Sequence, residues 1–242
     1  MKEKWRLIKD PPLTGKTNMD RDMEMLDEVA REKSPPSLRL YQWSPPAVSL
    51  GHFQKAEDVV NFEACRRFGV DVVRRPTGGR ALLHYREITY CLVVPENHHF
   101  ISRSVIESYR FLSRGLLQAM ENLGLKPMLA PEKTKNKALA PGSCYDTPSA
   151  FELQVGEKKL VGSAQLRQRG VLLQHGSVLL ELAPELNREV LLVPEQDSGS
   201  LDDSFLRERA AGLWDLGVEA GVEKIMKEVQ EGFASLFSAR FK

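Results

Sequence analysis

The chain has 242 residues, of which 42% are hydrophobic and 28% are charged. That apolar content can bury a sizeable core, which excludes a largely disordered protein. The 34 Lys and Arg residues nearly balance the 33 Asp and Glu residues, so the net charge of +1 predicts no general attraction to nucleic acid or to an anionic membrane. No apolar run approaches the ~20 residues of a membrane-spanning helix, and the charged N-terminus does not resemble a secretory signal. Three cysteines do not make a disulfide framework, so we expect a cytoplasmic protein.

Hydrophobic spacing and capping signals predict alternating helices and strands along the chain. The clearest helix covers residues 104–123, because Ser104 and Glu107 form a capping box at its start and Gly124 follows its end. In chain order we expect a helix from an N-cap at Asn18 to about Val29, strands at 38–43 and 47–50, a helix at 58–68, strands at 70–73 and 87–94, the helix at 104–123, strands at 151–155, 159–165 and 171–180, and a helix at 222–239.

This order of elements is typical of the α+β class. It predicts a mixed, mostly antiparallel β-sheet flanked by helices. No linker rich in Pro, Gly and Ser divides the chain. Residues 1–242 are therefore expected to form a single domain, with its core at about residues 30–220 and a C-terminal helix at 222–239.

Paired glycines follow a strand in the segment RRPTGGRALLH, residues 74–84. Gly78 and Gly79 would let backbone N–H groups approach an anionic ligand closely. Because side chains alternate along a strand, only one of Arg74 and Arg75 should face the side of the loop. A hairpin turn with solvated arginines explains the segment equally well, and its spacing fits neither a Walker loop nor a dinucleotide fingerprint.

Small residues mark the strand KLVGSAQ, residues 159–165. Gly162, Ser163 and Ala164 suit a backbone that lies against a substrate, and Lys159 would bring an ammonium to the same strand. The competing interpretation is a strand that simply begins with two solvated lysines.

Polar residues interrupt the otherwise apolar strand 171–180. His175, Gly176 and Ser177 conflict with the pattern of a core strand, and such conflicts tend to mark functional sites. A bulge containing a hydrogen-bonded core histidine is the alternative.

The three cysteines differ in their surroundings. Cys65 and Cys91 lie in apolar patterns and are expected to be small buried hydrophobes. Cys144 lies in the polar, Pro-bounded loop 131–149, where a nucleophilic thiol and an incidental loop thiol both remain open. An unperturbed thiol has a pKa near ~8.5, and a nearby ammonium, for which Lys159 is the nearest candidate, would raise the thiolate fraction. The five histidines show no metal-ligand spacing, so we expect no metal site.

Taken together, these stretches resemble the lipoate- and octanoate-handling branch of the biotin/lipoate protein ligase superfamily, over about residues 5–200. Residues 74–84 resemble the acyl-binding loop of that family, 159–165 its lysine-bearing strand, and 173–177 its following strand. The segment SCYDTPS around Cys144 resembles the nucleophile loop of the LipM-type octanoyltransferases. One departure is Arg80, where many ATP-using ligases of the superfamily have a third glycine.

The resemblance implies an octanoyltransferase with a biotin/lipoate protein ligase catalytic fold. Cys144 would attack the thioester of octanoyl-acyl carrier protein to form an S-octanoyl enzyme, with Lys159 stabilising the thiolate. The acceptor would be the lysine of a lipoyl domain, such as the glycine cleavage H protein, and no cofactor would be needed. Substrate-binding roles would fall to Arg75, Gly78, Gly79, His84, Gly162, Ser163, Ala164, His175 and Gly176. The sheet and the 104–123 helix would enclose the octanoyl tail.

Three other interpretations remain open at the level of sequence. The chain could be an ATP-dependent lipoate-protein ligase, a non-enzymatic protein that binds acyl groups or lipoyl domains, or a Cys–His hydrolase. Lys133, Lys135 and Lys137 could supply a local positive patch for an acidic partner, or could simply be solvated.

Overall fold

The computed structural model describes residues 3–130, 152–192 and 203–242. Its main sheet has eight strands in the order β11-β1-β2-β6-β10-β9-β8-β7. Only the β1–β11 and β1–β2 pairs are parallel, which confirms a mixed, mostly antiparallel sheet. The strands of this sheet are β1 (Glu3–Lys9), β2 (Ser37–Tyr41), β6 (Glu87–Pro95), β7 (Pro127–Leu129), β8 (Leu153–Val155), β9 (Lys158–Gln168), β10 (Val171–Leu179) and β11 (Ala239–Phe241).

A second, small sheet lies beside the main one. Its strands are β4 (Asp71–Arg74), β3 (Ala47–Leu50) and β5 (Leu82–His84), with β3 in the middle. Because β4 and β5 pair with opposite edges of β3, the segment between them crosses the sheet end and is not a hairpin turn. The paired glycines at 78 and 79 therefore lie in a crossing loop.

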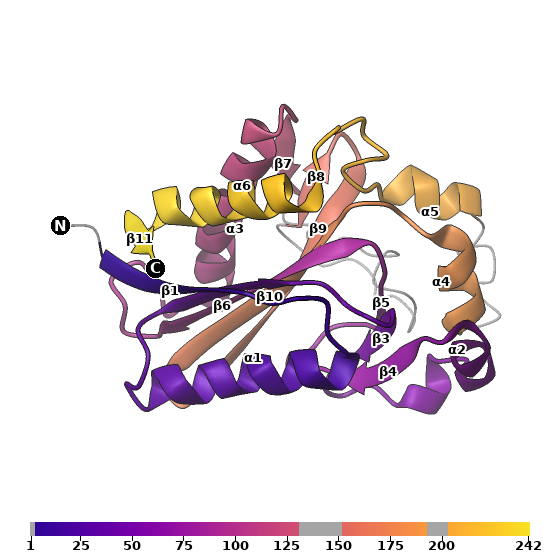
Figure 1. Ribbon diagram of the computed structural model, residues 1–242, viewed down its shortest axis with the longest axis horizontal. Coiled ribbons are helices and arrows are strands. Elements are labelled where there is room, and N and C mark those ends of the chain that lie inside the picture. Colours follow the sequence, from indigo (N-terminus) through magenta and orange to yellow (C-terminus); the bar gives the residue numbers. More distant parts are fainter. Residues whose placement is uncertain (1–2, 131–151, 193–202) are drawn as a thin grey trace.

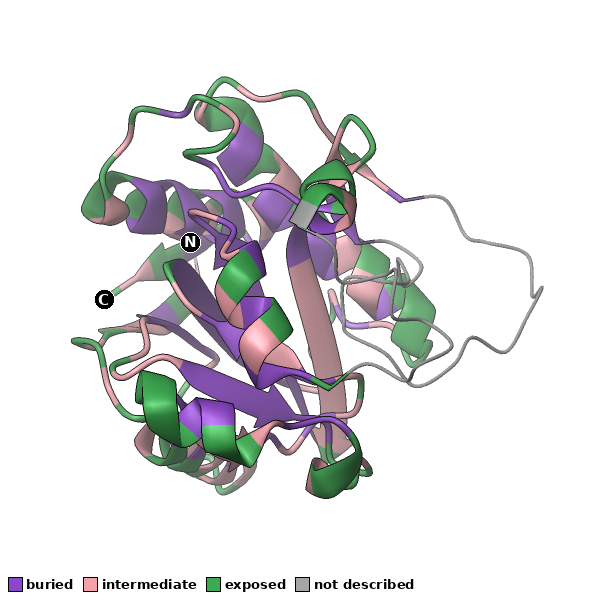
Figure 2. Cartoon of the chain, turned by 90° about the vertical axis from the view of Figure 1, so that its right-hand side faces the viewer, coloured by how far each residue is buried: buried purple, intermediate pink, exposed green. Residues whose placement is uncertain are grey.

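Helices cover both faces of the main sheet (Figure 1). Helix α1 (Gly15–Ala30) packs on one face through Met25, Leu26 and Val29. Helices α3 (Val105–Asn122) and α6 (Val222–Leu236) cover the other face, where they cross each other. Shorter helices, namely α2 (Phe62–Phe68), α4 (Pro184–Val190), α5 (Asp203–Arg209) and the 3₁₀ turn η1 (Ala56–Asp58), lie toward the small sheet. Figure 2 shows the sheet buried between helices whose outer faces are exposed.

Several sequence-based boundaries are wrong for identifiable reasons. The first helix begins after Thr14, whose hydroxyl accepts from the N–H of Thr17, whereas Asn18 lies inside the helix and donates to the carbonyls of Leu13 and Gln42. The second helix is capped by Asn61 and starts only at Phe62.

The two ends of the chain also differ from expectation. The C-terminal helix ends at Leu236 instead of residue 239, because Ser238 has a positive φ of 48° and Ala239 opens strand β11. β1 and β11 were not predicted, and they bring Trp5 and Ala239 into the main core. The core therefore extends beyond residues 30–220. None of the helices formed by the described residues is long and apolar enough to cross a membrane.

Candidate active site

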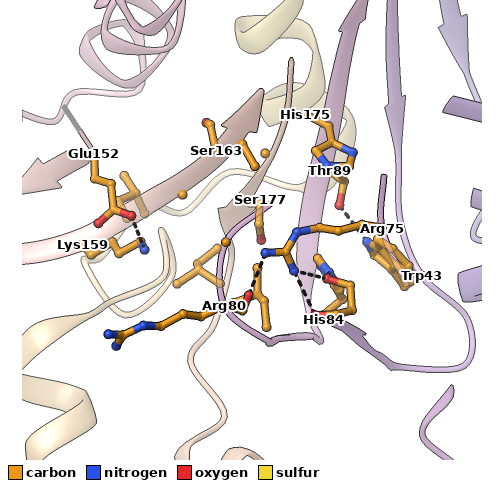
Figure 3. A pocket seen from close by; sticks show the side chains of 18 of the residues that line it. Trp43, Arg75, Arg80, His84, Thr89, Glu152, Lys159, Ser163, His175 and Ser177 are labelled. Atoms are coloured by element: carbon orange, nitrogen blue, oxygen red, sulfur yellow. Dashed lines mark hydrogen bonds and ion pairs between the residues drawn. The ribbon is translucent and has the colours of Figure 1, made fainter. Parts of the chain in front are cut away.

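A cavity of about 300 Å³ lies where the small sheet meets β9 and β10 (Figure 3). Figure 3 shows Lys159 and Glu152 at one end of it and Trp43 and Thr89 at the other. Most of the predicted site residues line this cavity: Arg75, Gly79, His84, Lys159, Gly162, Ser163, Ala164, His175 and Gly176. Gly78 is not among the lining residues, and Cys144 lies outside the described residues.

Lys159 is buried at its end of the cavity and forms an ion pair that sequence analysis missed. Its Nζ lies 2.6 Å from Oε1 of Glu152, and both side chains are less than one-tenth exposed. The alternative of a solvated lysine at a strand start is therefore wrong for Lys159. The sequence did contain a signal for Glu152 as the partner, because this acidic residue lies between Phe151 and Leu153, two apolar positions of an expected strand.

Part of the β9 backbone beyond Lys159 is not paired with β8. β8 pairs with β9 only as far as Val161, so from Gly162 onward the edge of β9 away from β10 has no partner in β8. Small side chains at residues 162–164 leave this edge accessible from the cavity that they line.

The 75–80 loop is shaped by Arg75, as the alternation of side chains in β4 predicts. Arg74 points away and donates to carbonyls of residues 51, 52 and 54. Arg75 is buried and donates to the carbonyl oxygens of Gly78 (2.9 Å) and Arg80 (2.7 Å) and to that of Ser49 (2.9 Å). The guanidinium of Arg75 thus ties the loop to Ser49 of β3.

His84 belongs to a buried polar chain on the cavity wall. Its Nδ1 lies 2.8 Å from Oε1 of Glu87, and its Nε2 lies 2.7 Å from the hydroxyl oxygen of Ser49. The ring of Trp43 stacks on the imidazole with centroids 4.0 Å apart, and its indole N–H donates to Thr89. This arrangement fixes the orientation of His84.

A second buried chain fixes His175. Its Nδ1 lies 3.0 Å from Asp22, and its Nε2 lies 2.7 Å from the hydroxyl of Thr77. β10 runs in continuous register with both neighbours here, so the expected alternative of a bulge is wrong. His175 is both a hydrogen-bonded core residue and part of the cavity wall, and through Thr77 it supports the 75–80 loop.

The apolar lining comes from side chains to which sequence analysis gave no role in the site. The helix at 104–123 contributes none of the described residues that line this cavity, and its expected role in enclosing an acyl tail stays a prediction. Tyr109 of that helix instead supports β9 from behind, by donating to the carbonyl of Ser163. The lining residues to which sequence analysis gave no catalytic or substrate-binding role include Met19, Tyr41, Trp43, Ser49, Leu82, Thr89, Glu152, Leu160, Ser177 and Leu179.

Asp22 joins the His175 chain to the core of the fold. It is fully buried, lies 2.7 Å from the equally buried guanidinium of Arg39, and accepts a hydrogen bond from the hydroxyl of Tyr41. Burial raises the pKa of Tyr41 well above its usual value, and the charge of Asp22 adds to that shift. Tyr41 is therefore a neutral donor at all ordinary pH values.

We expect Asp22→Ala to lower the free energy of unfolding by about 3–5 kcal/mol, because it leaves the buried Arg39 guanidinium without this carboxylate. Asp20→Ala, on the same helix but in the exposed pair with Lys16, should change it by less than about 1 kcal/mol. Urea denaturation of both variants measures the difference. An equal decrease in the free energy of unfolding for the two variants would contradict the stabilising role of the buried Asp22–Arg39 pair.

The two described cysteines are poor nucleophiles, as expected from their apolar patterns. Burial raises the pKa of the Cys65 thiol. Burial also raises the pKa of Cys91 well above its usual value, and the nearby charge of Asp22 adds to that effect. Alkylation proceeds through the thiolate, so these shifts lower the reacting fraction at neutral pH and move the reaction to more alkaline pH.

Iodoacetamide at neutral pH is therefore expected to modify one thiol of the native chain rapidly, namely Cys144. Peptide mapping after brief alkylation identifies the labelled residue, and denatured protein, in which all three react, is the control. Rapid labelling that persists in Cys144→Ala would show that a buried thiol is accessible and would contradict the prediction.

Known proteins resemble this chain over nearly its whole length. A family model described as the lipoyl protein ligase A/B catalytic domain matches residues 14–234. Octanoyltransferase LipM of Kyrpidia tusciae is 43% identical over 98% of this chain and 89% of its own length. Octanoyltransferase LipM of Bacillus subtilis is 38% identical over 96% of this chain and 86% of its own.

The chain belongs to the LipM octanoyltransferase family. It is thus an acyltransferase of the lipoyl protein ligase superfamily, as its motifs predict. A non-enzymatic binding protein is no longer an alternative.

Solved structures confirm the fold of this LipM family member. A lipoate-protein ligase A bound with ATP aligns with a TM-score of 0.76 at 22% identity, covering 100% of this chain and 88% of that one. A lipoate protein ligase from T. acidophilum with bound lipoic acid aligns with a TM-score of 0.73 at 21% identity, with the same coverage. The catalytic fold is that of the biotin/lipoate protein ligase superfamily.

Proposed function

We propose that this chain moves an octanoyl group from octanoyl-acyl carrier protein to the lysine of a lipoyl domain through a thioester on Cys144. The observation that carries the proposal is the buried ammonium of Lys159 at one end of a cavity with apolar walls. An apolar cavity suits an acyl tail, and an ammonium at its end suits a reaction that passes through thiolates. Octanoyl is proposed as the acyl group because the LipM relatives are named octanoyltransferases.

In the first step the thiolate of Cys144 attacks the carbonyl carbon of the donor thioester. A bond forms between the Cys144 sulfur and that carbon, and the bond to the carrier sulfur breaks. The departing thiolate takes a proton from Lys159, which becomes a neutral amine. The products are the S-octanoyl enzyme and the free carrier thiol.

In the second step the amine of the acceptor lysine attacks the octanoyl thioester. The new carbon–nitrogen bond forms as the bond to the Cys144 sulfur breaks. The attacking nitrogen gives a proton to Lys159, which regains its charge beside the Cys144 thiolate. The cycle balances without ATP, because a thioester is converted to a more stable amide.

Backbone N–H groups would bind the carbonyl oxygen as it becomes negative. The open edge of β9 from Gly162 to Ala164 supports this role, since it lines the cavity next to Lys159. The loop with Gly78 and Gly79 is the second candidate, and Gly79 adopts a positive φ of 99° there. Arg75, His84 and His175, with Gly176 beside it, would shape the acyl pocket.

The donor and the acceptor are the parts of the proposal that a transfer assay tests. Octanoyl-acyl carrier protein and the apo form of the glycine cleavage H protein are mixed with the enzyme without ATP, and the H protein is weighed. We expect octanoylated H protein. Product that forms only from free octanoate with ATP would instead identify a ligase, and release of free octanoate without acceptor would identify a hydrolase.

The three lysines proposed to meet acidic partners, at positions 133, 135 and 137, lie outside the described residues, so their role stays a prediction. A lipoyl domain is the acceptor class supported by the family.

A further inference from the structure

We infer that Glu152 is a positioning residue for Lys159, and that Gly162 completes the same device by leaving room for the lysine side chain. The inference rests on the proposed function, because it assigns the groups that hold the proposed proton carrier in place. It concerns residues that face the cavity on adjacent strands.

The two partners of the ion pair are fixed through different parts of the backbone. The carbonyl of Glu152 accepts from the N–H of Ala130 at 2.8 Å, and the carbonyl of Lys159 accepts from the N–H of Ala211 at 3.1 Å. Lys159 is also the second residue of the long strand β9 and forms a bridge with Ala210. The 2.6 Å ion pair therefore joins two points of the backbone that are each anchored outside the β8–β9 hairpin.

Gly162 lies directly beneath the end of the lysine side chain. A Cβ at this position would be 3.0 Å from Cε and 3.1 Å from Nζ of Lys159. These separations are tighter than ordinary contacts, so a side chain at position 162 would make the end of Lys159 shift by a few tenths of an ångström. Its φ lies outside the left-handed region, so the glycine serves to give space and is not needed for backbone conformation.

The physical need for such a device follows from the chemistry of lysine. Its four-carbon stem loses rotamer entropy when it is held in one place, and a buried ammonium without a carboxylate is costly. Glu152 offsets both effects, since it holds the nitrogen at one place and favours its charged form. A nitrogen that must give a proton to one thiolate and then take one from an amine needs this placement in both steps.

Glu152→Gln, which keeps the shape but removes the charge, tests the inference. We expect acylation of Cys144 at saturating octanoyl-acyl carrier protein to slow about 10²-fold with little change in the half-saturating donor concentration. The alkaline limb of its pH profile should move to lower pH, because burial then favours the neutral amine. Glu152→Asp, which keeps the carboxylate on a shorter stem, should restore part of the rate and the wild-type pH limb.

Two further variants separate positioning from general destabilisation. Glu157→Gln removes an exposed carboxylate from the same hairpin and should acylate at the wild-type rate. Gly162→Ala keeps every charge but crowds the ammonium, and should also slow acylation at least about 10-fold while its thermal unfolding stays close to wild type.

The measurement is single-turnover acylation followed by intact mass spectrometry from pH 6 to pH 9. If wild type forms no adduct, the proposed function fails and this inference fails with it. If wild type forms the adduct but Glu152→Gln and Gly162→Ala match its rate and pH profile, only the role of Glu152 and Gly162 is wrong.

Discussion

Replacing Cys144 by alanine is expected to lower the rate of octanoyl transfer to a lipoyl domain by about 10⁴-fold or more, because the covalent route is lost. Neither of the other two cysteines can take over the reaction. Cys65 and Cys91 are buried, burial raises the pKa of both thiols, and neither lines the cavity. The rate is measured by weighing the acceptor domain over time.

Cys65→Ala is the matched control, since it removes a thiol from the same chain without touching the cavity, and it should transfer octanoate at close to the wild-type rate. A Cys144→Ala enzyme that retained a tenth or more of the wild-type rate would contradict the covalent mechanism. ATP-dependent activity in that variant would point to the ligase alternative.

Replacing Lys159 by alanine is expected to reduce transfer by about 10²–10⁴-fold, the usual contribution of a positioned acid–base group. Lys159→Arg separates its two roles. A guanidinium keeps the positive charge beside Glu152 but does not give up its proton, so it supports the Cys144 thiolate without serving as the proton acceptor in the second step. The arginine variant should therefore still form some S-octanoyl enzyme, yet transfer its acyl group to the acceptor slowly.

The neighbouring lysine provides a control for this prediction. Lys158 is partly exposed and does not line the cavity, so Lys158→Ala should behave as wild type. Single-turnover measurements of each half-reaction by mass spectrometry give the two rates separately. Wild-type deacylation by Lys159→Arg would show that Lys159 does not accept the proton from the attacking amine.

Local signals predicted the parts of the fold whose hydrogen bonds are local. Ser104 accepts from the N–H of Glu107 and starts α3 where the capping box places it, and β10 occupies nearly the whole of the expected strand. β1 and β11 depend on parallel pairing between opposite ends of the chain. No local pattern encodes that pairing, which explains why both strands were missed.

In the site, too, local patterns marked some residues, and others depend on contacts between separate segments. The glycine-containing loop and the small residues of β9 departed from ordinary strand patterns, and this marked the cavity correctly. Glu152 and Lys159 meet through a register irregularity between Leu153 and Gln154, which places Gln154 opposite Lys159 and leaves Glu152 as a diagonal neighbour. At Asn18 a local signal was misleading. Asparagine is a good N-cap residue, but Asn18 lies inside α1 and its side chain donates hydrogen bonds to the carbonyls of Leu13 and Gln42.

The central claim is that the octanoyl group passes through a thioester on Cys144, and intact mass spectrometry tests it most directly. The enzyme is incubated with octanoyl-acyl carrier protein, without ATP and without acceptor, and weighed before and after treatment with hydroxylamine. We expect one octanoyl adduct on wild type, its removal by hydroxylamine, and its absence from Cys144→Ala. An unmodified wild-type enzyme, or an adduct that persists in Cys144→Ala, would contradict the mechanism.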